Sequence, residues 1–266
     1  MIRTRLITAA IAIPVLILAI LKLPPMWFAA LLAIVAALAL AEFLMMYNVP
    51  KSVLIPAVLL GGAVVIGKQA GYFANVLLIS FFIVVTLRLF MKREPHGALN
   101  DIAPVIFGLL YIPGLLSLLI PLRREDPFLI IMLLAMVWGG DAVAYFVGKS
   151  IGKRKLYVSM SPNKTWAGAI GSVLGGAGVA VILQVTVLKW IPIEQAAICG
   201  VIIGAVTVVG DLVESMLKRD AGIKDSGAWI PGHGGVLDKL DGSIYAGPAL
   251  YWLLISMGLI PRGLFS

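Results

Sequence analysis

The sequence predicts an all-α, polytopic integral membrane protein with about nine transmembrane helices. Hydrophobic residues make up 61% of the 266 residues, charged residues only 13%, and the mean hydropathy is +1.05. Apolar residues also occur in blocks of roughly the 20 residues that one helix needs to cross a bilayer. Helices satisfy their own backbone groups in lipid, and these blocks lack the apolar–polar alternation of barrel strands.

Nine spans can be marked along the chain. They cover residues 6–23, 26–47, 53–67, 73–91, 102–121, 127–148, 167–188, 196–217 and 244–261. The first has the basic lead of a signal peptide, but its apolar run is long and further spans follow directly, so we interpret it as uncleaved. The third is short and contains Gly61 and Gly62.

No soluble domain, long linker or repeat interrupts the spans. We therefore expect one membrane-embedded domain, 1–266, with N-terminal helices in 1–121 and C-terminal helices in 127–261. The N-terminal helices would provide the scaffold, the oligomer contact and the lipid side. Cys199 is the only cysteine, which excludes an intrachain disulfide and a cysteine-based metal cluster.

The basic residues predict a cytoplasmic N-terminus. With that orientation fourteen lie inside: Arg3, Arg5, Lys51, Lys92, Arg93, Lys149, Lys153, Arg154, Lys155, Lys164, Lys218, Arg219, Lys224 and Lys239. Six lie outside: Lys22, Lys68, Arg123, Arg124, Lys189 and Arg262. This bias explains the net charge of +8 without a nucleic-acid partner. The two longest loops, 149–166 and 218–243, then both face the cytoplasm.

Acidic residues concentrate near one of these loops. Six of the thirteen lie between residues 211 and 241: Asp211, Glu214, Asp220, Asp225, Asp238 and Asp241. An ionised group inside a span costs about 2.5–3.5 kcal/mol on the insertion scale, so Asp211 within an apolar helix needs a reason. Asp211 with Glu214, and Asp238 with Asp241, would each share a helix face. Such carboxylates suit Mg²⁺, and an ion-pair network with neighbouring lysines and arginines remains an equal alternative.

Both loops carry features of an anion site. Gly232, Gly234 and Gly235 allow the backbone to approach an anion closely, and His233 titrates near neutrality, so it could bind or catalyse. In "YVSMSPNKTWAGAIGS" a helix is expected to begin around Asn163 or Lys164, where hydroxyls, a lysine and amides could bind phosphate. An ordinary helix cap is the simpler explanation for that second stretch.

The run "SMLKRDAGIKDSGAWIPGHGGVLDKLD", Ser215–Asp241, resembles the signature of the phosphatidate cytidylyltransferase, or CDP-diacylglycerol synthase, family. The pattern reads S-x-x-K-R, four residues, K-D, a small residue, an apolar-Pro pair, H-G-G and D-R-x-D. "SPNKTWAG" and Asp141 with Ala144-Tyr145 resemble two further elements of the family. Lys239 stands where the family has arginine, which keeps the charge and loses the bidentate fork.

The resemblance implies an enzyme that joins CTP to phosphatidate, giving CDP-diacylglycerol and pyrophosphate, in the inner membrane with its site facing the cytoplasm. It implies one or two Mg²⁺ ions on Asp211, Asp238 and Asp241, and a homodimer. The expected catalytic cations are Lys218, Arg219 and Lys224. The expected substrate-binding residues are Asp141, Ser161, Lys164, Thr165, Ser215, Asp225, His233, Gly234, Gly235 and Lys239.

Two other functions are weighed against this one. A CTP-dependent lipid kinase, such as a polyprenol kinase, would use the same metal and cations, and it would also need a base for a lipid hydroxyl. An ion-coupled transporter would carry acids mid-span in two matching halves. Here Glu42 is the only early intramembrane acid, and the others crowd the inner ends of late spans.

Overall fold

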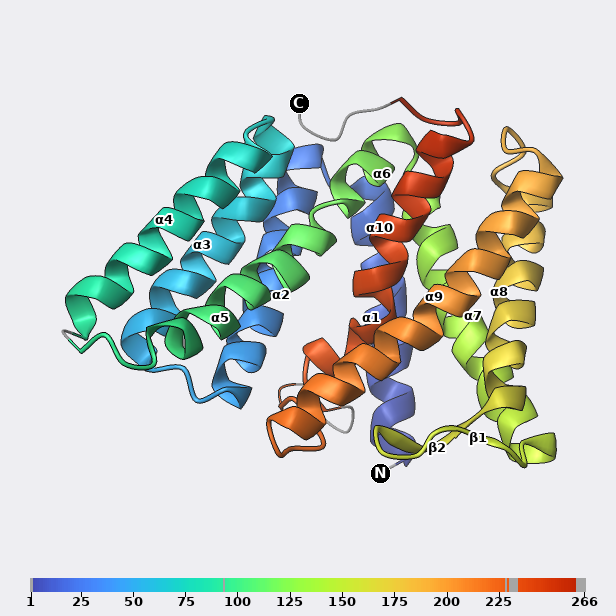
Figure 1. Cartoon of the computed structure of the whole chain (residues 1–266). Coiled ribbons are helices and arrows are strands. Elements are labelled where there is room, and N and C mark those ends of the chain that lie inside the picture. Colours follow the sequence, from blue (N-terminus) through green and yellow to red (C-terminus); the bar gives the residue numbers. More distant parts are fainter. Residues whose placement is uncertain (1, 93, 228, 230–233, 262–266) are drawn as a thin grey trace. The chain divides into compact units, whose positions relative to one another are not determined.

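The structure is a computed structural model that describes residues 2–92, 94–227, 229 and 234–261, with side chains described from Ala10 onward. Its helices, drawn in Figure 1, are α1 (Ile2–Lys22), α2 (Pro25–Met46), α3 (Lys51–Ala70), α4 (Phe73–Met91), α5 (Ala98–Leu109), α6 (Leu119–Glu125), α7 (Pro127–Ile151), α8 (Trp166–Thr186), α9 (Ile193–Asp220) and α10 (Asp241–Ser256). A π-helical turn, η1 (Leu110–Gly114), follows α5, and a 3₁₀ turn, η2 (Leu237–Lys239), precedes α10.

The helices confirm a polytopic membrane protein. Within the described part of the chain, seven helical segments are long and apolar enough to cross a membrane: α2, α3, α4, Ala98–Glu125, α7, α8 and α9. The predicted span 73–91 coincides with α4. The first and last predicted spans correspond to α1, whose described apolar stretch is Ala10–Lys22, and to α10, which with 16 residues is shorter than those seven.

The chain divides into two compact units. The first is formed by the residues up to Ile120 and by Asp225–Lys239; the second is formed by Pro121–Lys224 and the residues from Leu240 to Pro261. The segment 225–239 therefore belongs with the N-terminal helices, although it lies far along the chain between two helices of the second unit.

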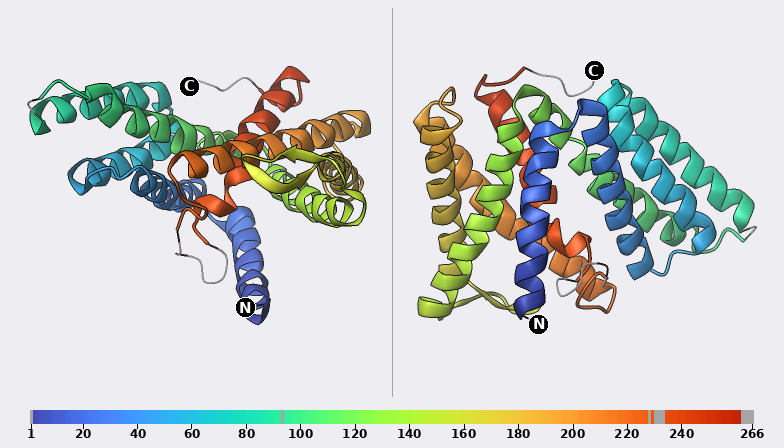
Figure 2. Two further views of the ribbon diagram at one scale, coloured as in Figure 1. Left: turned by 60° about the horizontal axis from the view of Figure 1, so that its bottom comes forward. Right: turned by 180° about the vertical axis from the view of Figure 1, so that it is seen from behind.

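The first unit is built on α2, α3, α4 and α5. In Figure 1, and from behind in Figure 2, α3 lies between α2 and α4, and these contacts are extensive. Leu40 and Phe43 of α2 are fully buried, and Gly61 and Gly108 allow α3 and α5 to approach them, since a Cβ at Gly108 would lie 2.8 Å from Leu40 Cδ1. Small residues thus let these helices pack closely, as is common in membrane bundles.

The second unit is built on α7, α8, α9 and α10. Asp126 caps α7 by accepting a hydrogen bond from the Phe128 amide at 2.9 Å, and Pro127 follows at the first helical position. Helices α8 and α9 lie in close contact, and Ser172 Oγ of α8 donates a hydrogen bond to the Gly204 carbonyl of α9 at 3.1 Å. Glycines on both helices make this approach possible.

One local expectation was wrong. Residues expected to start a helix at Asn163 or Lys164 instead form strand β2 (Ser161–Thr165), which pairs antiparallel with β1 (Lys155–Tyr157), and α8 begins at Trp166. A proline is tolerated at the edge of such a two-stranded ribbon. The predicted span 102–121 lies within the helical segment Ala98–Glu125, which is interrupted by the wide turn η1, where Pro113 lacks an amide hydrogen.

Candidate functional site

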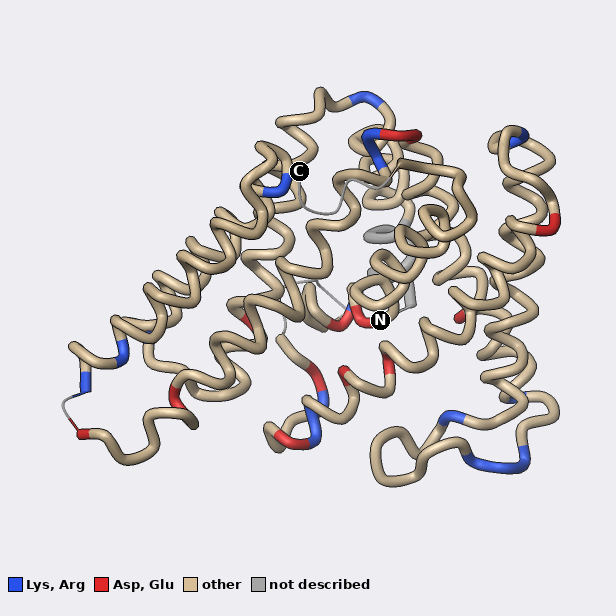
Figure 3. The backbone as a smooth tube through the Cα atoms, turned by 45° about the horizontal axis from the view of Figure 1, so that its top comes forward, with Lys and Arg blue, Asp and Glu red and all other residues tan. Residues whose placement is uncertain are grey.

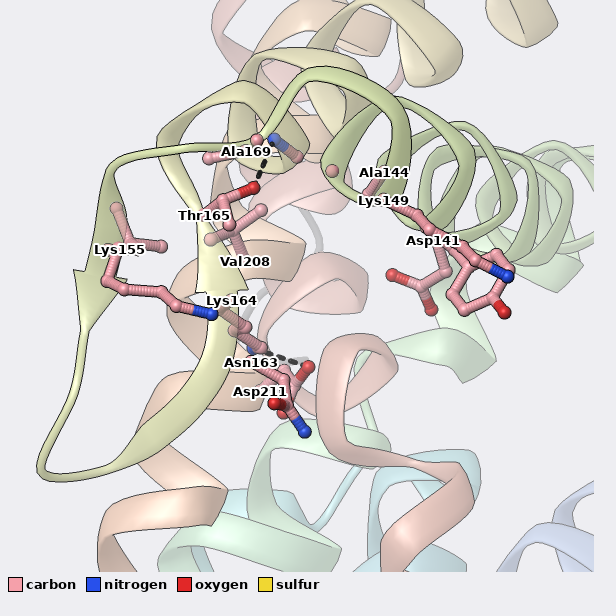
Figure 4. A pocket seen from close by; sticks show the side chains of 15 residues that line it. Asp141, Ala144, Lys149, Lys155, Asn163, Lys164, Thr165, Ala169, Val208 and Asp211 are labelled. Atoms are coloured by element: carbon pink, nitrogen blue, oxygen red, sulfur yellow. Dashed lines mark hydrogen bonds and ion pairs between the residues drawn. The ribbon is translucent and has the colours of Figure 1, made fainter.

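A pocket of about 580 Å³ lies within the second unit, between the hairpin, α7, α8 and α9. Figure 4 shows Asp141 of α7 on one side and Lys155, Asn163, Lys164 and Asp211 on the other. Of the residues expected from the sequence, Asp141, Lys164, Thr165 and Asp211 therefore meet in one pocket. Lys155 and Asn163 also line it and were not among the expected site residues, because the hairpin that places them there was not predicted.

Lys164 and Asp211 form an ion pair across this pocket. Lys164 comes from β2 and Asp211 from α9, and their side chains are 22% and 34% exposed. Ser215, one turn further along α9, directs its hydroxyl to Asp211 Oδ1 at 3.4 Å. The Lys164 Nζ atom is itself buried, whereas the Asp211 side chain is partly exposed, so water screens only one side of the pair.

Thr165 fixes the junction between the hairpin and α8. Its hydroxyl caps α8 by accepting a hydrogen bond from the Gly168 amide at 3.1 Å, and the residue is buried. A Cβ on Gly152 would lie 2.4 Å from Thr165 Oγ1, so glycine is needed where α7 ends. Ser161, the first residue of β2, is not among the described lining residues of the pocket.

Carboxylates gather near the pocket. Asp241 is the first residue of α10, ahead of the predicted span 244–261 and outside the seven long apolar helices. Burial, together with the negative charges of Asp211 and Asp141, raises the pKa of the Asp241 carboxyl to about 7, although the Gly242 amide donates to it at 2.7 Å. The three carboxylates thus repel one another, and a cation would relieve that repulsion.

The carboxylates fit a magnesium ion that keeps part of its water shell. Among the described residues, no three or more His, Cys, Asp or Glu side chains are arranged to hold a metal by themselves. Mg²⁺ usually binds proteins through one or two carboxylates and completes its shell with water and substrate phosphates. Asp211 and Asp241 can supply such a pair.

Basic residues at the end of α9 have internal partners. Lys218 Nζ lies 3.0 Å from Glu214 Oε1, and Glu214 is fully buried. Arg219 Nη1 donates to the Ile223 carbonyl at 2.9 Å and so closes the end of the helix. Lys224, Asp225 and Lys239 are exposed. Figure 3 shows that lysine and arginine also gather in the segment that joins α7 to α8.

The part of the signature from Asp225 to Lys239, which forms a loop, lies in the first unit. Asp238 Oδ2 accepts hydrogen bonds from the Ser226 amide at 3.0 Å and the Gly235 amide at 2.9 Å. Gly234 adopts a positive φ of 87°, which favours glycine. Asp238 and Asp241 do not share one helix, because η2 ends at Lys239 and α10 begins at Asp241. His233 and Gly232, with Ile230 and Pro231, lie outside the described residues.

Sequence reasoning missed the residue that holds this loop. Glu42 of α2 is fully buried and accepts hydrogen bonds from three groups of the loop: the Ser226 hydroxyl and the amides of Val236 and Leu237. The signal in the sequence was a lone acid within an apolar helix. Its partners lie about 190 residues further along the chain, and no local pattern identifies them.

Fold and site together define a polytopic helical membrane protein that presents lysines and carboxylates to one pocket near the ends of its helices. The chain belongs to the cytidylyltransferase family, whose sequence profile matches residues 3–257. It is therefore an enzyme of that family, as the signature between Ser215 and Asp241 implied.

Similar proteins carry more specific names. A phosphatidate cytidylyltransferase of Bacillus subtilis is 33% identical over 189 residues, which cover 70% of this chain and 67% of that protein. One from Brucella abortus is 43% identical over 137 residues, which cover 49% of each chain, so the match spans about half of that relative's length. An uncharacterized Escherichia coli protein, YnbB, is 32% identical over 180 residues, covering 65% of this chain and 60% of its own.

Proposed function

We propose that this enzyme transfers CMP from CTP to phosphatidate, giving CDP-diacylglycerol and pyrophosphate, at the cytoplasmic face of a membrane. The observation that carries the proposal is the pocket in which Asp141 and Asp211 face Lys155 and Lys164. A nucleotide triphosphate with its magnesium, meeting a lipid phosphate, needs both signs of charge in one place. The Bacillus and Brucella relatives are named phosphatidate cytidylyltransferases, which supports this choice of substrates.

In the proposed reaction a phosphate oxygen of the lipid attacks the α-phosphorus of CTP. The bond from that phosphorus to the oxygen bridging to the β-phosphate breaks, and pyrophosphate leaves with the bonding electrons. No general base is required, because a phosphate monoester already carries ≈ −1.5 to −2 charge at pH 7. Positioning and charge neutralisation therefore supply most of the rate.

Different residues of the site would bind the phosphates and the magnesium ion. Lys164 and Lys155, on the hairpin, would neutralise phosphate oxygens, and Asn163 would donate a hydrogen bond from the same side. Asp211 and Asp241 would hold Mg²⁺, which when bound neutralises charge on the pyrophosphate. Ser215 would orient Asp211 through their contact of 3.4 Å. Asp238, three residues before Asp241, stays a ligand predicted from the resemblance.

The ion pair between Lys164 and Asp211 suggests how the pocket responds to substrate. When a phosphate binds Lys164, the lysine would exchange the Asp211 carboxylate for a phosphate oxygen. Asp211 would then be available to the magnesium that accompanies CTP. Binding of the nucleotide and binding of the metal would in this way assist each other.

Purified protein in liposomes, supplied with Mg²⁺, phosphatidate and CTP labelled at either the α- or the γ-phosphate, tests the proposal. We expect α-label in the lipid and γ-label in released pyrophosphate. Label that reaches lipid only from the γ-position, with a lipid alcohol added, would mean a CTP-dependent lipid kinase. Transfer from neither position would refute a nucleotide-dependent activity and return attention to a transporter.

A further inference from the structure

Described residues of the loop that carries the family signature donate hydrogen bonds to one side chain of α2, that of Glu42. Glu42 Oε2 accepts hydrogen bonds from the Ser226 hydroxyl at 3.1 Å and the Leu237 amide at 2.8 Å. Glu42 Oε1 accepts one from the Val236 amide at 2.9 Å. Both carboxylate oxygens are therefore directed at the loop, and Glu42 is fully buried. A buried carboxylate is stable only when it is hydrogen-bonded in this way.

Glycines shape the loop to this carboxylate. A Cβ on Gly227 would lie 2.6 Å from Glu42 Oε1, and one on Gly235 would lie 2.4 Å from Glu42 Oε2. Real Cβ atoms do not approach so closely, so a larger residue at either position would displace the Glu42 carboxylate or the loop and disturb the hydrogen bonds between them. Two glycines of the signature thus have a packing reason that does not involve a nucleotide.

Asp238 makes the complementary contacts from inside the loop. Its Oδ2 accepts the Ser226 amide at 3.0 Å and the Gly235 amide at 2.9 Å. Ser226 therefore gives its hydroxyl to Glu42 and its amide to Asp238, while Gly235 packs against one and donates to the other. Glu42 and Asp238 thus hold Ser226, at one described end of the loop, close to residues 235–237 at the other.

These contacts also show which amides are already engaged. The amides of Gly235, Val236 and Leu237 donate to carboxylates of the protein itself, and Gly235 is one of the three glycines that the sequence suggested for anion binding. The carboxylates take the place that an anion would occupy in a backbone nest. Within the described part of the loop, the backbone therefore serves to fix the loop's shape.

We propose that Glu42 is a positioning residue for the transferase reaction: it holds the described ends of the loop, Ser226–Gly227 and Gly234–Asp238, in the geometry that CTP and its metal require. This inference rests on the proposed function. Glu42 acts through the loop, because all three of its hydrogen-bond donors among the described residues belong to these two ends. Its loss should therefore loosen the loop and spare the helix packing.

The direct test is hydrogen–deuterium exchange on the purified full-length protein, comparing wild type with Glu42→Gln. Glutamine has nearly the same shape, but its amide group would face an N–H donor of the loop. We expect exchange in the peptides covering 226–240 to rise by about tenfold or more, as for loss of a hydrogen bond to a charged group. Unchanged exchange there, or faster exchange throughout the helices, would overturn the proposal.

Two further variants keep this result interpretable. Asp101→Asn is the matched control: Asp101 also accepts hydrogen bonds within the first unit, and among the described residues its partners are Arg88 and Lys92, outside the loop. It should leave exchange at 226–240 unchanged. Ser226→Ala removes a single donor to Glu42, so it should raise exchange in the same peptides by a smaller factor if Glu42→Gln proves too unstable to purify.

Steady-state kinetics test the positioning role separately. We expect Glu42→Gln to raise the KM for CTP about tenfold, and Glu42→Asp, which keeps the charge, to restore part of the loss. A merely structural role would lower kcat through a smaller active fraction and leave KM unchanged, which would overturn the inference. Wild-type protein that transfers no CMP would refute the proposed function instead, and the exchange experiment would still show whether Glu42 holds the loop.

Discussion

At the scale of single residues, the pocket of the second unit depends on Lys164. It is the side chain that the hairpin places against Asp211, and it stands where the SPNKT stretch resembles the family. Its Nζ atom is buried beside the Asp211 carboxylate, and the side chain lines the pocket. We therefore interpret this lysine as a group that binds a ligand.

Lys164→Gln should therefore reduce catalysis without unfolding the protein. Loss of a charge-assisted hydrogen bond to phosphate, of about 1.5–3 kcal/mol, corresponds to a fall in kcat/KM of about tenfold to a hundredfold. Lys153→Gln is the control, since Lys153 is exposed on the same connection and is not among the lining residues. Equal activity of the two variants would remove Lys164 from the site.

From the raised pKa of Asp241 we predict that magnesium binding depends on pH. Its carboxyl has a pKa raised to about 7, chiefly by burial and then by Asp211 and Asp141, so protons compete with a cation near neutrality. The affinity for Mg²⁺ should rise as pH increases through 7 and level off above it. Calorimetric titration of wild type and Asp241→Asn checks this, because the variant should lose that dependence; a pH-independent affinity in wild type would contradict it.

At the scale of the elements, α8 and α9 approach each other through backbone. A Cβ on Gly204 would lie 2.6 Å from the Ser172 carbonyl oxygen and 2.7 Å from Val173 Cα. Neither neighbour is a flexible side-chain end, so the helices would have to separate. This contact also carries Asp211, seven residues after Gly204 on α9, toward the pocket wall.

Gly204→Ala should destabilise the protein by about 1–3 kcal/mol, the usual cost of overpacking. Gly178→Ala on α8 is the matched control, because a Cβ there meets nothing within 4 Å. That change should be neutral or slightly stabilising, since alanine favours helix over glycine. Thermal unfolding in detergent measures both, and equal melting temperatures would show that the α8–α9 contact can relax.

The elements also show what a single sequence can and cannot reveal. Apolar block length located the helices, and α4 was placed to the residue. The hairpin was missed because strands of three and five residues are too short to show a recognisable alternation of apolar and polar residues. Clustered acids and the signature indicated Asp141, Lys164 and Asp211 for the pocket, whereas Glu42 escaped because its partners are distant in sequence.

At the scale of the whole molecule, the prediction still to be tested is orientation. Fourteen basic residues on one side against six on the other favour a cytoplasmic N-terminus. The hairpin between α7 and α8 would then face the cytoplasm, where CTP is found. The connection between α8 and α9, which includes Lys189, would face outward.

Thiol labelling decides this orientation. Cys199 is the only cysteine and is buried, so Cys199→Ala gives a background for single cysteines. Lys153→Cys and Lys189→Cys lie at opposite ends of α8, and both positions are exposed. In intact cells, a membrane-impermeant maleimide should label the cysteine at 189 and spare the one at 153. The reverse pattern would place the site on the outer face.

The most direct test of the central claim compares CMP transfer by wild type, Asp211→Asn and Asp220→Asn. Asp220 ends the same helix and is exposed, so its variant controls for loss of a charge on α9. With α-labelled CTP, phosphatidate and Mg²⁺, we expect transfer by wild type and by Asp220→Asn, and a loss of about a hundredfold or more in Asp211→Asn at unchanged melting temperature. Full activity of Asp211→Asn would contradict the account, because the pocket that this carboxylate lines could not then be the site of transfer.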